Sequence, residues 1–184
     1  MKYSKDAWAN VYQRTLKDGL AESVCDLIKF IPRGIKHDSI FNKIRKFFYE
    51  LCGLKIGLRS YIYHGVAVIC PSNIEIGNDS FINYGGLLSA YSKIKIGDRV
   101  SIGYNCSIIT ESHNLESPDF EAIIKPVIIE DNAWIGSNAV ILPGAHIFEG
   151  AVIAAGAVVS GNIDSYSVYA GVPAKKIKDR KIKE

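Results

Sequence analysis

The stretch from Ile129 to Val159 reads IEDNAWIGSNAVILPGAHIFEGAVIAAGAVV, and it decides the fold. Aliphatic side chains recur at every sixth position, and alanines recur in a fixed phase four residues later. An α-helix repeats every 3.6 residues and a strand every two, so neither produces this pattern. A three-sided β-solenoid produces it, with one hexapeptide on each side of a coil. The aliphatic positions are Ile129, Ile135, Ile141, Ile147, Ile153 and Val159, and the alanines are Ala133, Ala139, Ala145, Ala151 and Ala157.

The same period continues upstream in three groups of three hexapeptides, each of which fits one coil. The groups begin at Ile56, Ile76 and Ile96, and the step between them widens from six to eight residues. We interpret the widening, at Pro71–Glu75 and Ala90–Lys95, as two extra residues at a corner. Successive coils are expected to stack as parallel strands about 4.8 Å apart.

Two further features of the repeat predict how the corners are built. Small residues in the fourth phase, such as Ser60 and Cys106, are expected inside tight corners. Glycines directly after an aliphatic, such as Gly97 and Gly136, are expected where the turn needs backbone freedom that a Cβ would oppose.

The period breaks once, between Ile108 and Ile129. This separation is 21 residues, where one further side of the solenoid needs six. A loop at about 110–126 therefore leaves the solenoid, and it carries the run TESHN with His113. Long loops on rigid scaffolds are common places for function.

Composition predicts one soluble domain with appendages. The chain has 184 residues, 48% of them hydrophobic, and no apolar run near 18 residues, so no membrane span is expected. The first residues lack the layout of a secretory signal, and the four cysteines show neither metal nor redox spacing. We expect a reduced, cytoplasmic protein with no metal site.

The chain divides into a helical segment (1–53), the solenoid (54–169) and a basic tail (170–184). Apolar residues from Trp8 to Ile28 recur at helical spacing, and a second helix is predicted from about Ser39 to Cys52, with Asp38 as a candidate cap. Its apolar side is expected to cover the open end of the solenoid. Contact with a membrane surface is the alternative.

Charge is unevenly distributed along the chain. Residues 1–53 carry ten basic and six acidic side chains, residues 54–174 carry six and eleven, and the last ten residues carry six and two. The tail is interpreted either as a short solvated terminal helix or as a phosphate-binding edge. Nucleic acid is not an expected partner, because no aromatic residues interleave with the lysines and the acidic body would repel a phosphate backbone.

Four motifs together give the chain a resemblance to a known family. They are the hexapeptide repeats, the loop with His113, the run NAWIGS at Asn132–Ser137 and the ending AGVPAK at Ala170–Lys175. Over about residues 54–178 the chain resembles the hexapeptide-repeat acyltransferases, and within them the sugar and polysaccharide O-acetyltransferases. The resemblance implies a left-handed parallel β-helix, acetyl-CoA as co-substrate, and a homotrimer with sites between subunits.

His113 is the predicted catalytic residue. Transfer of an acetyl group to a hydroxyl needs a base with a pKa near neutrality, which histidine provides, and His113 is the histidine in the extruded loop. The other reading of a lone loop histidine is a solvent-exposed side chain. His37, His64 and His146 are expected to be structural. Metal catalysis, which also occurs on this fold, is not expected, since it needs three converging histidines.

The remaining site residues follow from the resemblance alone. It implies that the main chain of Ser137 stabilises the thioester oxygen and that Trp134 lines the CoA groove, although Trp134 also suits a packing role. It further implies that Asn83 binds the acceptor hydroxyl, with a turn role as the competing interpretation. The other cofactor positions implied are Ala155, Ser160 and Gly161 along pantetheine and adenine, and Lys175 and Lys178 near the phosphates.

The expected acceptor is inferred from two differences between this chain and the family pattern. Enzymes of this family that act on small sugars tend to carry an acidic residue where this chain has Tyr91, and they begin with a helical leader that is not found here. A capsule or lipopolysaccharide type of glycan is therefore the preferred acceptor, with direct transfer in a ternary complex. The alternatives are an antibiotic hydroxyl, a sugar-nucleotide amine, or a non-catalytic solenoid used for assembly or binding.

Overall fold

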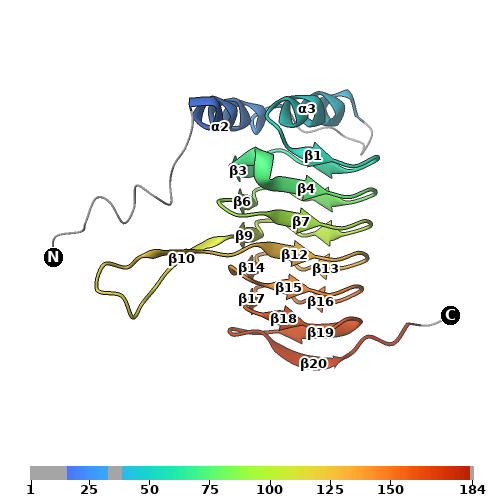
Figure 1. Ribbon diagram of the computed structural model, residues 1–184. Helices are drawn as coiled ribbons and strands as arrows, with labels where there is room; N and C mark the ends of the chain where they lie inside the picture. Colours follow the sequence, from blue (N-terminus) through green and yellow to red (C-terminus); the bar gives the residue numbers. More distant parts are fainter. Residues whose placement is uncertain (1–15, 33–38, 183–184) are drawn as a thin grey trace.

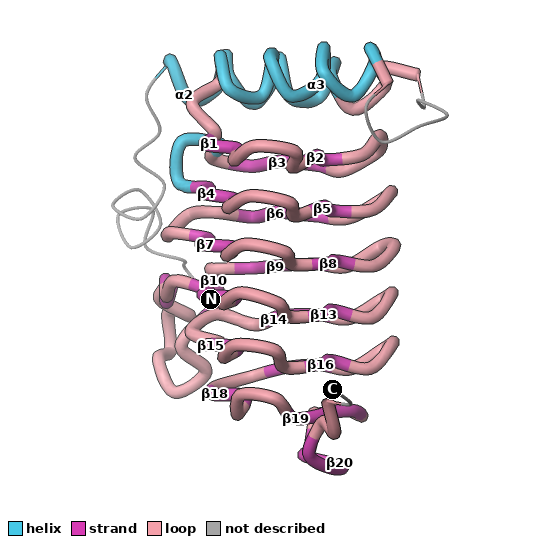
Figure 2. The backbone as a smooth tube through the Cα atoms, turned by 90° about the vertical axis from the view of Figure 1, so that its right-hand side faces the viewer, coloured by secondary structure: helices cyan, strands magenta, loops and turns pink. Residues whose placement is uncertain are grey.

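The computed structural model describes residues 16–32 and 39–182 as a triangular prism of stacked coils with two helices across one end (Figure 1). The mainly β, left-handed parallel β-helix expected from the sequence is confirmed. Each coil crosses three sheets in turn, as the flat stack of coils in Figure 2 shows. Among the described residues, no helix is long and apolar enough to cross a membrane.

The three sheets form the three sides of the prism, and nearly all neighbouring strands are parallel. Sheet A contains β1 (Lys55–Ile56), β4 (Ile74–Ile76), β7 (Ile94–Ile96), β12 (Val127–Ile129), β15 (His146–Ile147) and β18 (Asn162–Ile163). Sheet B contains β2 (Tyr61–Ile62), β5 (Phe81–Ile82), β8 (Ser101–Ile102), β13 (Trp134–Ile135), β16 (Val152–Ile153), β19 (Ser167–Ala170) and β20 (Lys175–Asp179). Sheet C contains β3 (Ala67–Ile69), β6 (Leu87–Ser89), β9 (Ser107–Ile109), β14 (Val140–Ile141) and β17 (Val158–Val159).

The core is the column of side chains that the six-residue period places inside the prism. Ile135 pairs in register with Ile102 above it and Ile153 below it, and all three are buried. The small-residue positions are buried as predicted, and the serines among them also bond between coils. Ser80 Oγ donates to Gly97 O at 2.8 Å, and Ser60 Oγ accepts from Ser80 N at 2.8 Å.

The glycines that follow aliphatics serve a different purpose from the one expected. A Cβ on Gly136 would lie 2.5 Å from Ala155 N, and one on Gly97 would lie 2.8 Å from Asp131 N, in the next coil. Close stacking of the coils therefore requires these glycines. The left-handed backbone belongs to residues two positions later, such as Arg99 (φ 54) and Asn138 (φ 60).

Two helices, α2 (Leu16–Ile28) and α3 (Ile40–Leu51), close one end of the prism. The cap of α3 is Ser39, whose side chain accepts a hydrogen bond from Asn42 N, and not Asp38, which lies outside the described residues. Trp8 and the other apolar positions before Leu16 also lie outside them. A short 3-10 turn, η1 (Pro71–Asn73), accommodates the wider step expected at Pro71–Glu75.

The expected orientation of α3 is wrong. Its buried side chains are Asn42, Arg45 and Tyr49, whereas its apolar residues point away from the core. The first coil has no coil above it, so its backbone carbonyls need other donors. Tyr49 Oη donates to Val66 O at 3.3 Å, and Lys46 Nζ donates to Gly57 O at 2.5 Å. Polar side chains therefore cap the open end of the solenoid.

The short helix expected in the basic tail is also wrong. Residues Lys175–Asp179 form β20, which pairs antiparallel with β19 at the last coil. An uncovered strand edge presents unpaired N–H and C=O groups, and the returning chain satisfies them. The two ends of the solenoid are thus closed differently: polar side chains of α3 cap the first coil, and strand β20 covers the last.

Candidate functional site

The loop at about 110–126 is a β-hairpin, formed by β10 (Glu111–His113) and β11 (Ala122–Ile124), that projects sideways from the prism (Figure 1). Its root is fixed by buried polar groups. Thr110 Oγ1 donates to Ser89 O at 2.8 Å, and Ser89 Oγ donates to Glu111 Oε1 at 2.6 Å. Thr110 and Ser89 are fully buried, so the hairpin leaves the solenoid in a defined direction.

His113 lies at the outer end of β10, paired with Ala122 across the hairpin. Its Nδ1 lies 3.0 Å from Phe120 O. A carbonyl only accepts, so Nδ1 carries the proton in this contact and Nε2 is the basic nitrogen of the neutral ring. The hairpin therefore fixes a tautomer that can take a proton from a substrate hydroxyl.

A groove of about 910 Å³ runs along sheet B beside Trp134. Its lining includes Val152 and Val168 on the sheet and, on the tail that forms its rim, three basic residues and one acidic one: Lys178, Asp179, Arg180 and Lys181. Trp134 is 56% exposed, which favours the groove-lining role over packing. An apolar floor with a basic rim suits a pantetheine arm that ends in phosphates.

The other predicted residues lie along two edges of the prism that flank sheet C. Asn83, Ser137 and Ala155 occupy the turns from sheet B to sheet C, here called the BC edge. Ser160 and Gly161 occupy the turn from sheet C to sheet A, the CA edge, and the hairpin leaves from that same edge. Ala155, Ser160 and Gly161 are exposed, so the surface there is shallow.

Within one chain the structure unites only part of the predicted site. Trp134 and Lys178 line the same groove, and Lys175 lies on the same strand as Lys178. His113 stands on the hairpin at the CA edge, whereas Trp134 lies on sheet B and Ser137 on the BC edge. A single chain therefore does not place its base beside its own groove.

Hydrogen bonds at the BC edge bear on the roles predicted for Asn83 and Ser137. Asn83 Nδ2 donates to Ile102 O at 3.1 Å, so this side chain also serves the turn, as its competing interpretation proposed. Ser137 Oγ accepts from Tyr104 N at 3.1 Å, which holds the turn in which the Ser137 main chain lies.

The residues expected to be structural behave differently from His113. His146 points outward on sheet A, where its Nε2 lies 2.8 Å from Glu130 Oε1 and its ring stacks on Phe148. Cys106 is buried, and burial raises the pKa of its thiol, which opposes a role as nucleophile. In the described part of the chain, no group of three or more His, Cys, Asp or Glu side chains is arranged to hold a metal ion.

Sequence reasoning missed Arg180 and Glu111. Arg180 follows Lys178 by two positions and shares the rim of the groove, a spacing that places both on one side of an extended chain. The tail was expected to form a helix, so the two-residue spacing of Lys178 and Arg180 was not recognised as a signal. Glu111 was noted only as a motif residue, because its partner Ser89 lies 22 positions earlier.

Comparisons with known proteins agree with the solenoid fold. Residues 126–161, which are 36 of the 184 residues, match the bacterial transferase hexapeptide (six repeats) family, and this match confirms the hexapeptide repeats read from that part of the sequence. A hexapeptide-repeat-containing acetyltransferase from Vibrio cholerae is 28% identical, with a TM-score of 0.78 over 91% of this chain and 95% of that one. The same protein has been solved with acetyl coenzyme A, and that structure is 27% identical with a TM-score of 0.77 over 91% of both chains.

Two other proteins show how far the likeness extends. A galactoside acetyltransferase in complex with coenzyme A has a TM-score of 0.80 over 98% of this chain and 86% of that one, at 24% identity, and shares the fold. A 2,3,4,5-tetrahydropyridine-2,6-dicarboxylate N-acetyltransferase from Ligilactobacillus salivarius is 53% identical over 55 residues, or 30% of this chain. The match spans 24% of that relative's length.

Proposed function

We propose that this chain, which has the hexapeptide-repeat solenoid fold, is an acetyl-CoA-dependent O-acetyltransferase acting on a hydroxyl of a sugar or surface glycan. The observation that carries the proposal is a histidine, held in one tautomer by Phe120 O on a rigid hairpin, in a solenoid that also carries an apolar groove with a basic rim. Similarity to acetyltransferases over most of the chain supports it.

In the proposed reaction, His113 Nε2 accepts the proton of the acceptor hydroxyl while its oxygen attacks the thioester carbon. The carbonyl of Phe120 stabilises the imidazolium that forms, because it accepts a hydrogen bond from Nδ1–H. The main chain at Ser137 is assigned to the developing oxyanion, where a donor on a rigid coil needs no reorganisation. The thiolate of CoA then leaves and takes the proton from the imidazolium, which regenerates the neutral base, so the acetyl group passes directly from CoA to the acceptor.

The groove on sheet B is assigned to the co-substrate. Trp134 and the valines beside it offer an apolar wall to the pantetheine arm, and Lys178 and Arg180 offer cations to its phosphates. The turns at Ala155 and Ser160–Gly161 present small residues, which allow an extended molecule to lie against the coils.

A threefold assembly completes the site. The outward side chains of sheet C are uncharged, whereas sheet A carries Lys55, Glu75 and Lys95 in register. Packing three copies with sheet C toward a common axis sets the CA edge of each copy against the BC edge of the next. His113 of one copy then faces Ser137 and the groove of its neighbour. The outward residues of sheet C include Ala67, Ile69, Leu87, Ser107, Ile109, Val140 and Val158.

Aromatic rings beside Asn83 support a glycan acceptor. Tyr84 and Tyr104 stack with ring centroids 5.9 Å apart on the BC edge, and Tyr104 is half exposed. Aromatic faces suit the apolar faces of sugar rings, and Asn83 offers a polar group next to them. Tyr91 lies in the CA-edge turn one coil before the hairpin, adjacent to Ser92, whose N–H donates to Thr110 Oγ1. Because enzymes of this family that act on small sugars tend to carry an acidic residue at the position of Tyr91, a capsule or lipopolysaccharide type of acceptor is preferred.

The test is release of CoA thiol from acetyl-CoA in the presence of candidate glycans. We expect His113→Ala to lower kcat by about 10²- to 10⁴-fold, which is the usual contribution of a general base. His146→Ala is the matched control, since it removes an imidazole from sheet A. Equal turnover by wild type and His113→Ala would refute the assignment, and absence of turnover in both would favour a binding module.

An amine acceptor is the second candidate. It is favoured by the 53% identity to an N-acetyltransferase over 55 residues. Comparing glycans, sugar-nucleotide amines, amino-dicarboxylates and hydroxylated antibiotics as acceptors in the same assay separates these readings. Acetylation confined to amines would replace the hydroxyl acceptor while leaving the fold and co-substrate unchanged.

A further inference from the structure

The most unusual surface of the described chain is the outer side of the two end helices, here called the cap surface. Both helices place an apolar stripe in solvent, where soluble monomers rarely expose a large contiguous apolar patch. Its large side chains are Leu16, Leu20, Val24, Leu27 and Phe30 in and after α2, and Ile40, Phe41, Ile44, Phe47, Phe48 and Leu51 in α3.

The stripes are a consequence of how the cap is attached. The polar side of α3 is committed to the solenoid through Arg45 and Tyr49, and Cys25 and Ile28 are the buried residues of α2. The remaining side of each helix therefore faces outward. Neither helix can turn its stripe inward without losing the bonds to the first coil.

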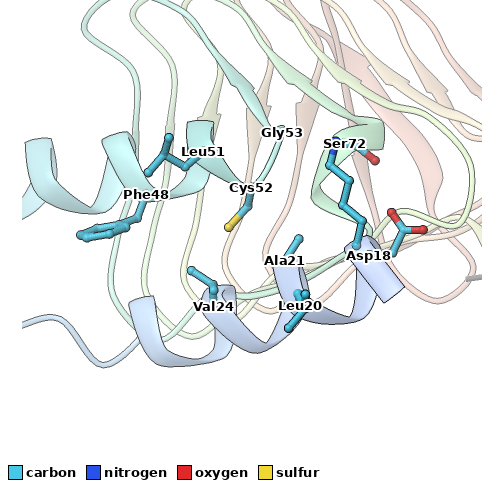
Figure 3. A pocket seen from close by; sticks show the side chains of 10 residues that line it. Asp18, Leu20, Ala21, Val24, Phe48, Leu51, Cys52, Gly53 and Ser72 are labelled. Carbon is cyan, nitrogen blue, oxygen red and sulfur yellow. The ribbon is translucent and has the colours of Figure 1, made fainter. Parts of the chain in front are cut away.

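The two stripes meet at a groove of about 510 Å³ between the helices. Figure 3 shows Leu20 and Val24 of α2 on one side of this groove and Phe48 and Leu51 of α3 on the other. Both helices lie across the end of the prism, so the cap surface is broad and roughly perpendicular to the stack of coils (Figure 1). An apolar surface that lies across one whole end of the prism suits a partner with an apolar interior.

Charge indicates the nature of that partner. Residues 1–53 carry ten basic and six acidic side chains, of which five basic and four acidic ones lie in the described ranges 16–32 and 39–53, whereas residues 54–174 carry six basic and eleven acidic side chains. Two acidic groups of the cap have partners within the chain: Glu22 accepts from Cys70 N at 3.0 Å, and the exposed Asp26 pairs with Lys29 at 2.8 Å. A second copy of the cap would bring like net charges together, while an anionic surface would attract it.

We propose that the cap surface docks on an anionic phospholipid bilayer, with α2 and α3 lying in the interface. Amphipathic helices that carry basic side chains bind membranes in this way, with their apolar faces buried among the headgroups and upper acyl chains. The acidic solenoid and the hairpin with His113 then remain in water. A threefold assembly about an axis along the prism would place all three caps at the same end, which strengthens the docking.

The test is flotation of the full-length protein with vesicles of mixed phosphatidylglycerol and phosphatidylcholine. Leu20→Glu combined with Leu51→Glu places two carboxylates on the cap surface at positions that are both 67% exposed, so folding is not disturbed. We expect this variant to float at least about 10-fold less than wild type. Ile182→Glu, an exposed apolar residue of the tail, is the matched control and should float like wild type.

Failure of the wild type to float, or equal flotation of the cap variant, would overturn the proposal. A doubled mass in sedimentation that the cap variant halves, without flotation, would also overturn it and assign the surface to a second copy. The assay uses neither acetyl-CoA nor an acceptor, so its outcome is separate from that of the proposed reaction.

Discussion

Replacing Arg45 with methionine tests whether polar side chains hold the cap on the solenoid. Arg45 is fully buried and joins three segments, since its guanidinium donates to Asn42 Oδ1 at 2.7 Å, Ile31 O at 2.9 Å, Pro32 O at 3.1 Å and Ile62 O at 3.4 Å. Methionine keeps much of the packing but leaves these acceptors without their donor.

The expected cost follows from these four bonds. Hydrogen bonds to a charged group contribute about 1.5–3 kcal/mol each, but water can reach Pro32 and the contact to Ile62 is long. Burial lowers the pKa of Arg45, so desolvation of the guanidinium opposes the gain. We expect a net loss of about 3 kcal/mol in the free energy of unfolding, or about 6–12 °C in Tm for a chain of this size.

Urea unfolding at one fixed protein concentration measures this loss, because assembly makes apparent stability depend on concentration. Lys43→Met, on the exposed side of the same helix, is the control and should change stability by less than about 0.5 kcal/mol. If Arg45→Met is no less stable than Lys43→Met, the cap is held by something other than these bonds.

The remaining predictions concern the coils, an ion pair and the groove. Gly136→Ala should lower the free energy of unfolding, measured in urea, by at least about 1–3 kcal/mol, because its Cβ would lie 2.5 Å from Ala155 N. Gly19→Ala in α2 is the control: its Cβ would meet nothing within 4 Å, so this variant should be more stable than wild type by about 0.5–1 kcal/mol. The reverse order of stabilities would refute the stacking argument. Lysines on both sides lower the pKa of Glu75 to about 2, so its contribution is present above the ordinary carboxylate pKa of about 4.3 and is lost as pH falls toward 2. Glu75→Gln should cost less than about 1 kcal/mol at neutral pH, because the pair is exposed, and nothing below about pH 2; a cost that persists in acid would contradict this. Trp134→Ala should raise the Kd for acetyl-CoA about 10-fold in calorimetry, and an unchanged Kd would show that Trp134 does not contact bound acetyl-CoA.

The solenoid was predictable because its repeat is both local and strict. Each hexapeptide specifies one buried aliphatic and one small corner residue, so a single stretch such as residues 129–159 determines the geometry of every coil. The purpose of the glycines was not predictable, because the atoms that exclude a Cβ on Gly136 belong to the next coil, 17 to 19 residues away.

The ends of the solenoid were harder to predict for a different reason. An apolar stripe normally faces a core, and that rule placed Phe47 and Leu51 inside. The open end of a β-helix presents carbonyls instead, so Arg45 and Tyr49 face it. The spacing of Asn42, Arg45 and Tyr49 by three and four residues was the available signal. The tail formed a strand because the last coil has an edge to cover.

The candidate site was predictable residue by residue but not as an arrangement. A motif marks His113 and Trp134, yet nothing local indicates that they lie on opposite parts of one chain. Only the route of the coils through sheets A, B and C separates the CA edge from the BC edge.

The central claim is that the base of one copy serves the groove of the next, and subunit mixing tests it most directly. His113→Ala removes the base, and Ala155→Trp obstructs the assigned path of pantetheine at an exposed position on the BC edge, so each variant alone should be inactive. Mixed trimers, purified through a different tag on each variant, contain one site in three with both parts intact. We predict about one third of wild-type activity in these trimers. No recovered activity in verified mixed trimers would show that the base and the groove do not come from different copies.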